Sequence, residues 1–194
     1  YKELNMYKPG ALVILDGFGS STDTTFNAIT KAHTPHFDAW FDQFPLTTLK
    51  ASGEAVGLPD GFIGNSEVGH MTIGAGQIIP QPITIINHAI ANGSFFTNPT
   101  LVDALTKLHA SKKTLHLIGL LSDAGVHGYK EHIFAFLKAA HQQAIERIIV
   151  HPILDGRDSP PRSAALFLEE LQRIINDYPT AVIGSLHGRF YAMD

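Results

Sequence analysis

Two kinds of apolar pattern alternate along the second half of the chain. Short runs of branched apolar residues predict buried strands at Thr114–Leu121, Arg147–Leu154 and Ala181–Leu186. Apolar residues at helical spacing predict helices over residues 98–110, 130–144 and 162–177. Strand and helix therefore alternate, which is typical of an α/β fold with a parallel sheet and right-handed crossovers.

The first half of the chain is less regular. Buried strands are predicted at Ala11–Leu15 and Thr47–Leu49, and a helix at Thr25–His33. A second helix is predicted at His36–Phe44, with an aromatic stripe that we expect in the core. The pattern changes after Gly76, so we expect one domain over residues 1–77 and another over residues 78–194.

Composition limits the possible functions. The 194 residues carry a net charge of −4 and no run of Lys or Arg, which argues against binding to nucleic acid or to a membrane surface. No apolar run is long enough for a membrane span and residues 1–5 do not resemble a signal peptide, so we expect a cytoplasmic protein. Without cysteine, any metal must be bound by carboxylate, imidazole or hydroxyl groups.

Two polar residues in the first half are candidates for chemistry. Ser66 lies between Gly64 and Gly69, ahead of helix-compatible residues, so its hydroxyl is either a nucleophile at a helix N-terminus or an ordinary N-cap. Asp16 follows the predicted strand Ala11–Leu15 and is either a ligand-binding group or a turn residue.

Four further candidates follow the predicted strands of the second half. His127, Arg157, Asp158 and Arg189 come after strand ends, and the carboxyl ends of parallel strands meet at one edge of a sheet. Each alone is more simply a loop or surface group. Together they predict an anion site, because the two guanidinium groups match phosphate or carboxylate.

The chain resembles the 2,3-bisphosphoglycerate-independent phosphoglycerate mutases of the alkaline phosphatase superfamily. The resemblance covers nearly the whole chain and is carried by segments at Leu15–Gly19, Ala51–Pro59, Gly64–His70, Gly74–Gly76, Leu121–His127, Leu154–Asp158 and Gly188–Asp194. It implies part of a phosphatase-like metal domain followed by an inserted parallel βαβ substrate domain.

The resemblance also implies roles for the candidate residues. Ser66 would take the phosphoryl group of 3-phosphoglycerate and return it to give 2-phosphoglycerate. Asp16 and Ser66 would bind one of two divalent ions, usually manganese, without 2,3-bisphosphoglycerate as a cofactor. His127, Arg157, Asp158 and Arg189 would bind the substrate, with Asp158 as an acid or base. The full-length enzyme would be a monomer acting in glycolysis.

Members of this family are much longer, and most of their metal ligands lie beyond the segments matched here. We therefore expect the 194 residues by themselves to be inactive, since Asp16 and Ser66 are too few ligands for a metal site. Two alternatives remain: a non-catalytic anion-binding module, or another metal-dependent phosphatase or phosphomutase of the superfamily.

Overall fold

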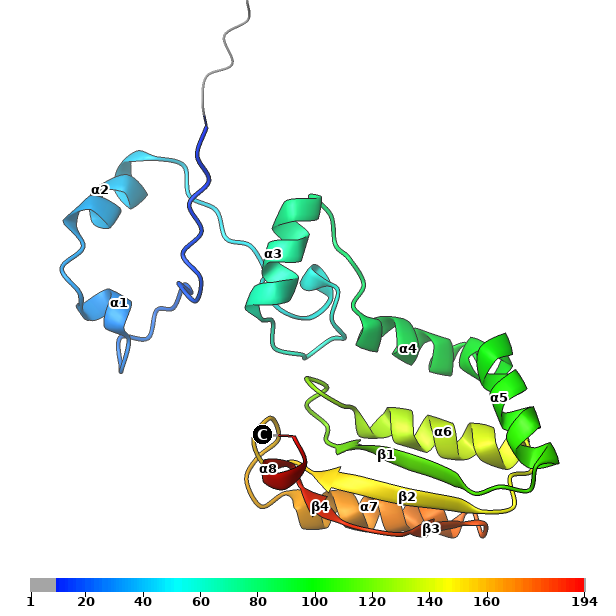
Figure 1. The fold of residues 1–194 in the computed structure, drawn as a ribbon. Coiled ribbons are helices and arrows are strands. Elements are labelled where there is room, and N and C mark those ends of the chain that lie inside the picture. The colour runs from blue at the N-terminus through cyan, green and yellow to red at the C-terminus, as the bar shows by residue number, and fades with distance from the viewer. Residues whose placement is uncertain (1–9, 194) are drawn as a thin grey trace, which may run out of the picture.

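The computed structural model describes residues 10–193 (Figure 1). Residues 1–9, which open the predicted first domain and include the segment compared with a signal peptide, lie outside the described residues, as does Asp194 of the last motif. The described part of the chain contains no helix that is long and apolar enough to cross a membrane.

A parallel sheet forms the centre of the second half and confirms the predicted α/β class. Strands β1 (Leu115–Leu121), β2 (Ile148–Leu154) and β3 (Ala181–Ile183) lie in that order, and β4 (His187–Gly188) also pairs with β2. All of these pairs are parallel, with Leu115 opposite Ile148 and Ile148 opposite Ala181. The carboxyl ends of the strands therefore lie at one edge, as the sequence predicts.

Helices α6 (Lys130–Gln142) and α7 (Ala164–Asn176) contribute to one core with alternate residues of the sheet (Figure 1). Leu137 and Leu171 are fully buried there. The opposite face carries exposed apolar residues such as Ile118 and Val182. Short helix α8 (Arg189–Ala192) follows β4, and α5 (Pro99–Ala110) precedes β1, with Asn98 as its N-cap.

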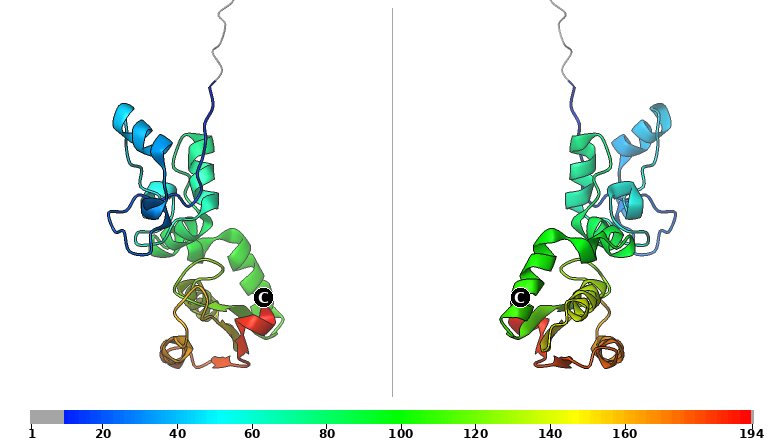
Figure 2. Two further views of the ribbon diagram at one scale, coloured as in Figure 1. Left: turned by 90° about the vertical axis from the view of Figure 1, so that its left-hand side faces the viewer. Right: turned by 90° about the vertical axis from the view of Figure 1, so that its right-hand side faces the viewer.

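Ahead of the sheet the described residues form helices and loops only. These helices share short length and few buried residues: α1 (Ala28–Lys31), α2 (Pro35–Gln43), η1 (Gly53–Val56), α3 (Ser66–Ala75), α4 (Pro82–Ala91) and η2 (Ser94–Thr97). Figure 1 and Figure 2 show α1 and α2 at the end of the molecule away from the sheet, and Figure 1 shows α3 and α4 between these two helices and the sheet. Helix α4, which begins at Pro82 shortly after the change of pattern at Gly76, was not predicted.

The two N-terminal strand predictions are wrong. Residues 11–15 and 47–49 are not strands, and Leu12, Val13 and Leu49 are each more than 70 % exposed. A strand is stable only when a neighbouring strand satisfies its N–H and C=O groups, and every strand of the described residues lies between positions 115 and 188. An apolar run without such a neighbour stays extended and exposed.

Both helices predicted in this region form, but the first is shorter than predicted and the second does not bury its apolar residues. The φ angle of Phe26 is 56°, so the helix predicted from Thr25 begins only after Asn27, whose side chain accepts from the N–H groups of Ile29 and Thr30. Helix α2 forms as predicted, yet it has no buried residue, and Trp40 is 53 % exposed. The aromatic stripe is therefore not core; Phe37 instead packs against Phe18, with ring centroids 5.6 Å apart.

A second, small core lies beside α3. It contains Val56, Leu58 and Val68, with Phe62 and Ile83 packed against it. Gly57 is required there, because its φ is 80° and a Cβ at this position would lie 1.9 Å from the carbonyl oxygen of Ile79. The boundary between residues 77 and 78 stays a prediction.

We expect Leu171→Ala to lower the free energy of unfolding by about 2–5 kcal/mol, because it would leave a cavity between α7 and the sheet. Leu166→Ala on the same helix is the matched control: Leu166 is 66 % exposed, and a change within about 0.5 kcal/mol is expected. Urea unfolding followed by circular dichroism measures both. Equal losses in the two variants would contradict the described core.

Candidate functional site

Ser66 is the first residue of α3, and it does not cap the helix. Asn65 is the N-cap, and its side-chain oxygen accepts from the backbone N–H of Val68 at 3.1 Å. The Ser66 hydroxyl instead donates to Oδ2 of Asp16 at 2.6 Å. The N-cap interpretation of Ser66 is therefore wrong, and the hydroxyl lies exposed at the positive end of a helix dipole.

Asp16 lies in a turn that brings its carboxylate to Ser66. The N–H of Phe18 donates to the carbonyl of Leu15 at 3.1 Å, and Gly17 has φ 77°. Asp16 is therefore a turn residue whose side chain reaches a residue 50 positions away, and its interpretation as a ligand-binding group stays a prediction. The glycines around Ser66 have different surroundings: a Cβ on Gly64 would lie 1.7 Å from the carbonyl oxygen of Ala51, whereas Gly69 has open space.

His70 is the third side chain at this position, and sequence analysis did not select it. Its Nδ1 lies 2.8 Å from the carbonyl oxygen of Ser66 and 3.2 Å from Ser66 Oγ. A signal was present, because residues i and i+4 of a helix are neighbours on its surface. Asp16, Ser66 and His70 are called the serine cluster below.

The serine cluster offers a divalent metal ion part of a site. The oxygens of Asp16 and Ser66 are hard donors that suit Mg²⁺ or Mn²⁺. Such ions take about six ligands, and residues 10–193 contain no group of three or more His, Cys, Asp or Glu side chains placed to hold a metal. The described residues therefore do not make a complete metal site.

A second polar cluster lies at the carboxyl edge of the sheet, around Asp155. The Asp155 side chain is fully buried directly after β2. Its carboxylate accepts from Ser122 Oγ at 2.6 Å, which links the ends of β1 and β2. It also accepts from three backbone N–H groups of the following loop, those of Arg157, Asp158 and Ser159. Sequence analysis did not select Asp155 or Ser122.

Arg189 completes this second cluster. Its Nη1 donates to Oδ2 of Asp158 at 2.5 Å and to Oδ1 of Asp155 at 3.2 Å. The Arg189 side chain is only 7 % exposed, so its interpretation as a solvated surface group is wrong. Asp155, Asp158 and Arg189, with Ser122, are called the aspartate cluster below.

The structure brings two of the four predicted edge residues into direct contact. Asp158 and Arg189 form an ion pair, whereas His127 and Arg157 are exposed on the loops that follow β1 and β2. His127 lines a cavity of about 370 Å³ beside β1, together with Tyr129 and His132. The four residues thus follow strand ends as predicted, and their functional roles stay predictions.

The loop after β1 packs against the N-terminal half of the chain. Phe62, four positions before Ser66, packs edge-on against Tyr129 with ring centroids 5.8 Å apart. A Cβ on Gly125, whose φ is 67°, would lie 2.2 Å from a ring carbon of Phe62. The segment that leads to Ser66 is therefore in contact with the loop that carries His127.

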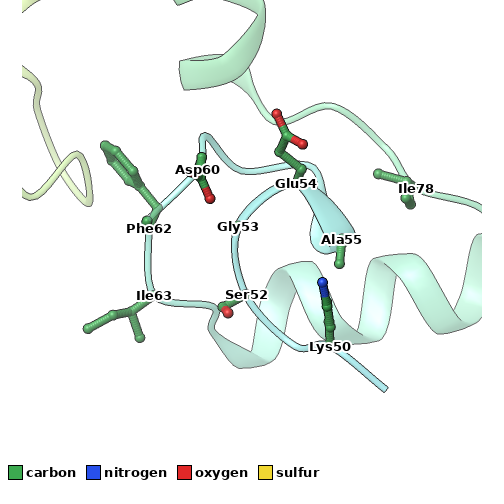
Figure 3. Close-up of a pocket in the computed structure, with 10 residues that line it drawn as sticks. Lys50, Ser52, Gly53, Glu54, Ala55, Asp60, Phe62, Ile63 and Ile78 are labelled. Carbon is green, nitrogen blue, oxygen red and sulfur yellow. The ribbon is translucent and has the colours of Figure 1, made fainter. Parts of the chain in front are cut away.

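A larger hollow of about 810 Å³ lies beside α3 (Figure 3). Lys50, Glu54 and Asp60 provide its charged side chains, and Phe62, Ile63 and Ile78 its apolar ones. No predicted site residue lines this hollow. The candidate site is therefore defined by the two polar clusters and not by this hollow.

The pKa of the Asp155 carboxyl lies well below its usual range. Burial raises this pKa, but the hydrogen bonds from Ser122 and from the backbone N–H groups of Arg157, Asp158 and Gly156 lower it by more. The native state therefore prefers the charged carboxylate. This preference stabilises the fold above the pKa of an unfolded aspartate, about 3.9, and the contribution is lost as the pH falls through the lower, folded-state pKa.

Comparisons with known proteins agree on one family. A family model described as the BPG-independent PGAM N-terminus matches residues 86–194. The 2,3-bisphosphoglycerate-independent phosphoglycerate mutases of two Coxiella burnetii strains, Dugway 5J108-111 and RSA 493 / Nine Mile phase I, are each 52 % identical to the chain over 187 residues. These matches cover 96 % of the chain and 36 % of each relative, so the chain spans about a third of their length.

A solved structure shows the same fold. It is described as Leishmania mexicana phosphoglycerate mutase at low cobalt concentration, and it matches with a TM-score of 0.77 and 36 % identity. The match covers 93 % of this chain and 34 % of the Leishmania chain.

We expect Asp155→Asn to lower the free energy of unfolding at pH 7 by about 3 kcal/mol. The substitution removes one of the two carboxylates that neutralise the buried guanidinium group of Arg189. Near pH 3 the difference from the unchanged protein should begin to shrink, since the unfolded aspartate is then mostly protonated while the folded one is still charged. Urea unfolding at the two pH values measures this. Asp177→Asn, at an exposed aspartate, is the control; a pH-independent effect of Asp155→Asn would contradict the assignment.

Proposed function

The chain belongs to the 2,3-bisphosphoglycerate-independent phosphoglycerate mutases, and we propose that it is the N-terminal part of an enzyme that interconverts 3-phosphoglycerate and 2-phosphoglycerate. The observation that carries the proposal is the hydrogen bond from Ser66 Oγ to Asp16 at the N-terminus of α3. The names of the relatives and the matched family model support the same reaction.

Ser66 is proposed as the nucleophile. Its Oγ attacks the phosphorus of 3-phosphoglycerate and forms phosphoserine, while its proton passes to the Asp16 carboxylate, to which the hydroxyl already donates. The free N–H groups and the dipole at the start of α3 favour the phosphoryl group at this position. A divalent ion, when bound, would supply positive charge that makes the Ser66 hydroxyl easier to deprotonate.

The substrate is proposed to bind at the carboxyl edge of the sheet. Arg157 and Arg189 would bind its carboxylate or phosphate, and His127 would contribute a further donor. Asp158, a carboxylate that accepts from Arg189, would remove the proton of the glycerate hydroxyl that takes the phosphoryl group back, and would return that proton in the reverse reaction. The proton released by Ser66 would balance the glycerate oxygen whose phosphoryl bond breaks. Water must be excluded while the glycerate turns, because hydrolysis of phosphoserine would make the enzyme a phosphatase.

The finer features of the proposal rest on family membership. Residues 1–77 would belong to an alkaline-phosphatase-like metal domain and residues 78–194 to an inserted substrate domain. Two manganese ions would serve the reaction without 2,3-bisphosphoglycerate, with the remaining metal ligands outside these 194 residues. The complete enzyme would be a cytoplasmic, glycolytic monomer that acts on small molecules and not on nucleic acid or membranes.

In the complete enzyme, Ser66→Ala should reduce mutase activity at least about 1,000-fold, because it removes the proposed nucleophile. Acid quenching with labelled 3-phosphoglycerate should trap phosphoserine in the wild type and not in the variant. Ser111→Ala, at an exposed serine, is the matched control and should retain both activity and label. Phosphoserine formed by Ser66→Ala would contradict the assignment.

The 194-residue chain alone should form no 2-phosphoglycerate with 3-phosphoglycerate and Mn²⁺, because Asp16 and Ser66 supply too few ligands to hold the ion. A coupled enolase assay measures this, with the complete enzyme as positive control. Measurable turnover by the chain would contradict this account of the metal site. Binding of 3-phosphoglycerate that ignores Mn²⁺, with a complete protein that is also inactive, would favour the anion-binding module instead.

A further inference from the structure

Ser122, the residue after β1, holds both ends of the loop that carries His127. Its hydroxyl oxygen accepts from the backbone N–H of Ala124 at 3.2 Å, near the start of the loop. Its carbonyl oxygen accepts from the backbone N–H of Lys130 at 2.8 Å, where the loop ends and α6 begins. The position of His127 therefore depends in part on one fully buried residue.

Asp155 has the same place at the end of β2. Its carboxylate accepts from the backbone N–H groups of Arg157 and Asp158 and from the guanidinium group of Arg189. These are three of the four predicted edge residues, and the fourth is His127. One buried carboxylate thus bonds directly to three of the four groups that are proposed to bind substrate.

A hydrogen bond joins these two loops. Leu121 and Leu154 are opposite each other in the parallel register of β1 and β2, so the next residues, Ser122 and Asp155, lie side by side at the carboxyl edge. The Ser122 hydroxyl donates to Oδ2 of Asp155 at 2.6 Å. Because hydrogen bonds lower the pKa of Asp155, the acceptor is charged at neutral pH and the bond is of the stronger, charge-assisted kind. This contact is called the Ser122–Asp155 bridge below.

We propose that Ser122 and Asp155 are positioning residues for substrate binding: their bridge sets the spacing between the loop that carries His127 and the groups held by Asp155. This inference rests on the proposed function of the four predicted edge residues. Ser122 and the Asp155 side chain are fully buried, so both act through their neighbours and not by touching the ligand. A ligand bound by groups of both loops gains affinity when the spacing of those groups is fixed before it arrives.

A role in folding alone predicts another result. Loss of the Ser122 hydroxyl would then lower the stability of the protein, as the loss of a buried hydrogen bond does, without changing how the folded molecule binds substrate. Leu171→Ala is the matched control, because Leu171 is fully buried in the core between α7 and the sheet and belongs to neither loop.

The first measurement compares these variants in the complete enzyme. Ser122→Ala should raise KM for 3-phosphoglycerate about tenfold and change kcat by less than about threefold, because the binding groups are present but no longer held at the right spacing. Leu171→Ala should leave KM within about twofold of the wild type. An unchanged KM in Ser122→Ala, or an equal increase in Leu171→Ala, would overturn the inference.

The second measurement tests whether the two residues act through one bond. Asp155→Asn removes the charged acceptor, so adding Ser122→Ala to it should raise KM by less than about a further twofold. Independent roles would give increases that multiply, and that result would contradict the bridge. Where Asp155→Asn does not fold, the comparison of Ser122→Ala with Leu171→Ala decides alone.

Hydrogen exchange separates this inference from the function on which it rests. In the complete protein without substrate, Ser122→Ala should speed exchange at the backbone amides of Arg157, Asp158 and Ser159, which donate to Asp155, by at least about threefold. Unchanged exchange at these amides would overturn the inference whatever the activity. A wild-type protein that forms no 2-phosphoglycerate would refute the proposed function, and the exchange result would then decide by itself whether the bridge holds the two loops.

Discussion

The carboxyl edge of the sheet depends on the hydrogen bonds that satisfy the buried carboxylate of Asp155. A charge removed from water costs several kcal/mol unless donors replace the lost hydration. Asp155 receives five donors: the Ser122 hydroxyl, three N–H groups of its own loop, and the Arg189 guanidinium. Because these donors lie in the segments that directly follow β1, β2 and β4, satisfying this one charge fixes the geometry of three chain segments.

This constraint explains why Asp158 and Arg189 meet. Asp158 lies three residues after Asp155, and its N–H donates to the same carboxylate that accepts from Arg189. The ion pair between Asp158 and Arg189 is therefore formed in a framework that is already held, and it needs little additional loss of side-chain freedom. Arg157 gives only its backbone N–H to the Asp155 carboxylate, and Arg157 and His127 are both exposed residues.

The serine cluster is organised on a different principle. Short-range contacts hold it: Asn65 caps α3, and His70 contacts Ser66 one helical turn away. Only Asp16 comes from a distant part of the chain. In both clusters a nearby residue stabilises the local structure. Asn65 caps α3, so the Ser66 hydroxyl is not needed as a cap. Asp155 holds the loop after β2, so the Asp158 carboxylate is available for the chemistry proposed for it.

Sequence alone predicted a parallel sheet with helices between its strands, because the apolar residues of positions 98–186 pack against partners within the same segment. It did not predict the order of the strands, and the strand predicted at Ala181–Leu186 ends at Ile183, with β4 following at His187–Gly188. It also placed Asp158 and Arg189 at one edge, which follows from topology. Only the tertiary structure decided the rest: Leu12 and Trp40 are exposed because burial needs a partner surface that a local pattern cannot report. Asp155 and His70 escaped notice for the same physical reason, since their roles lie in hydrogen bonds whose distances and directions exist only once the chain has folded.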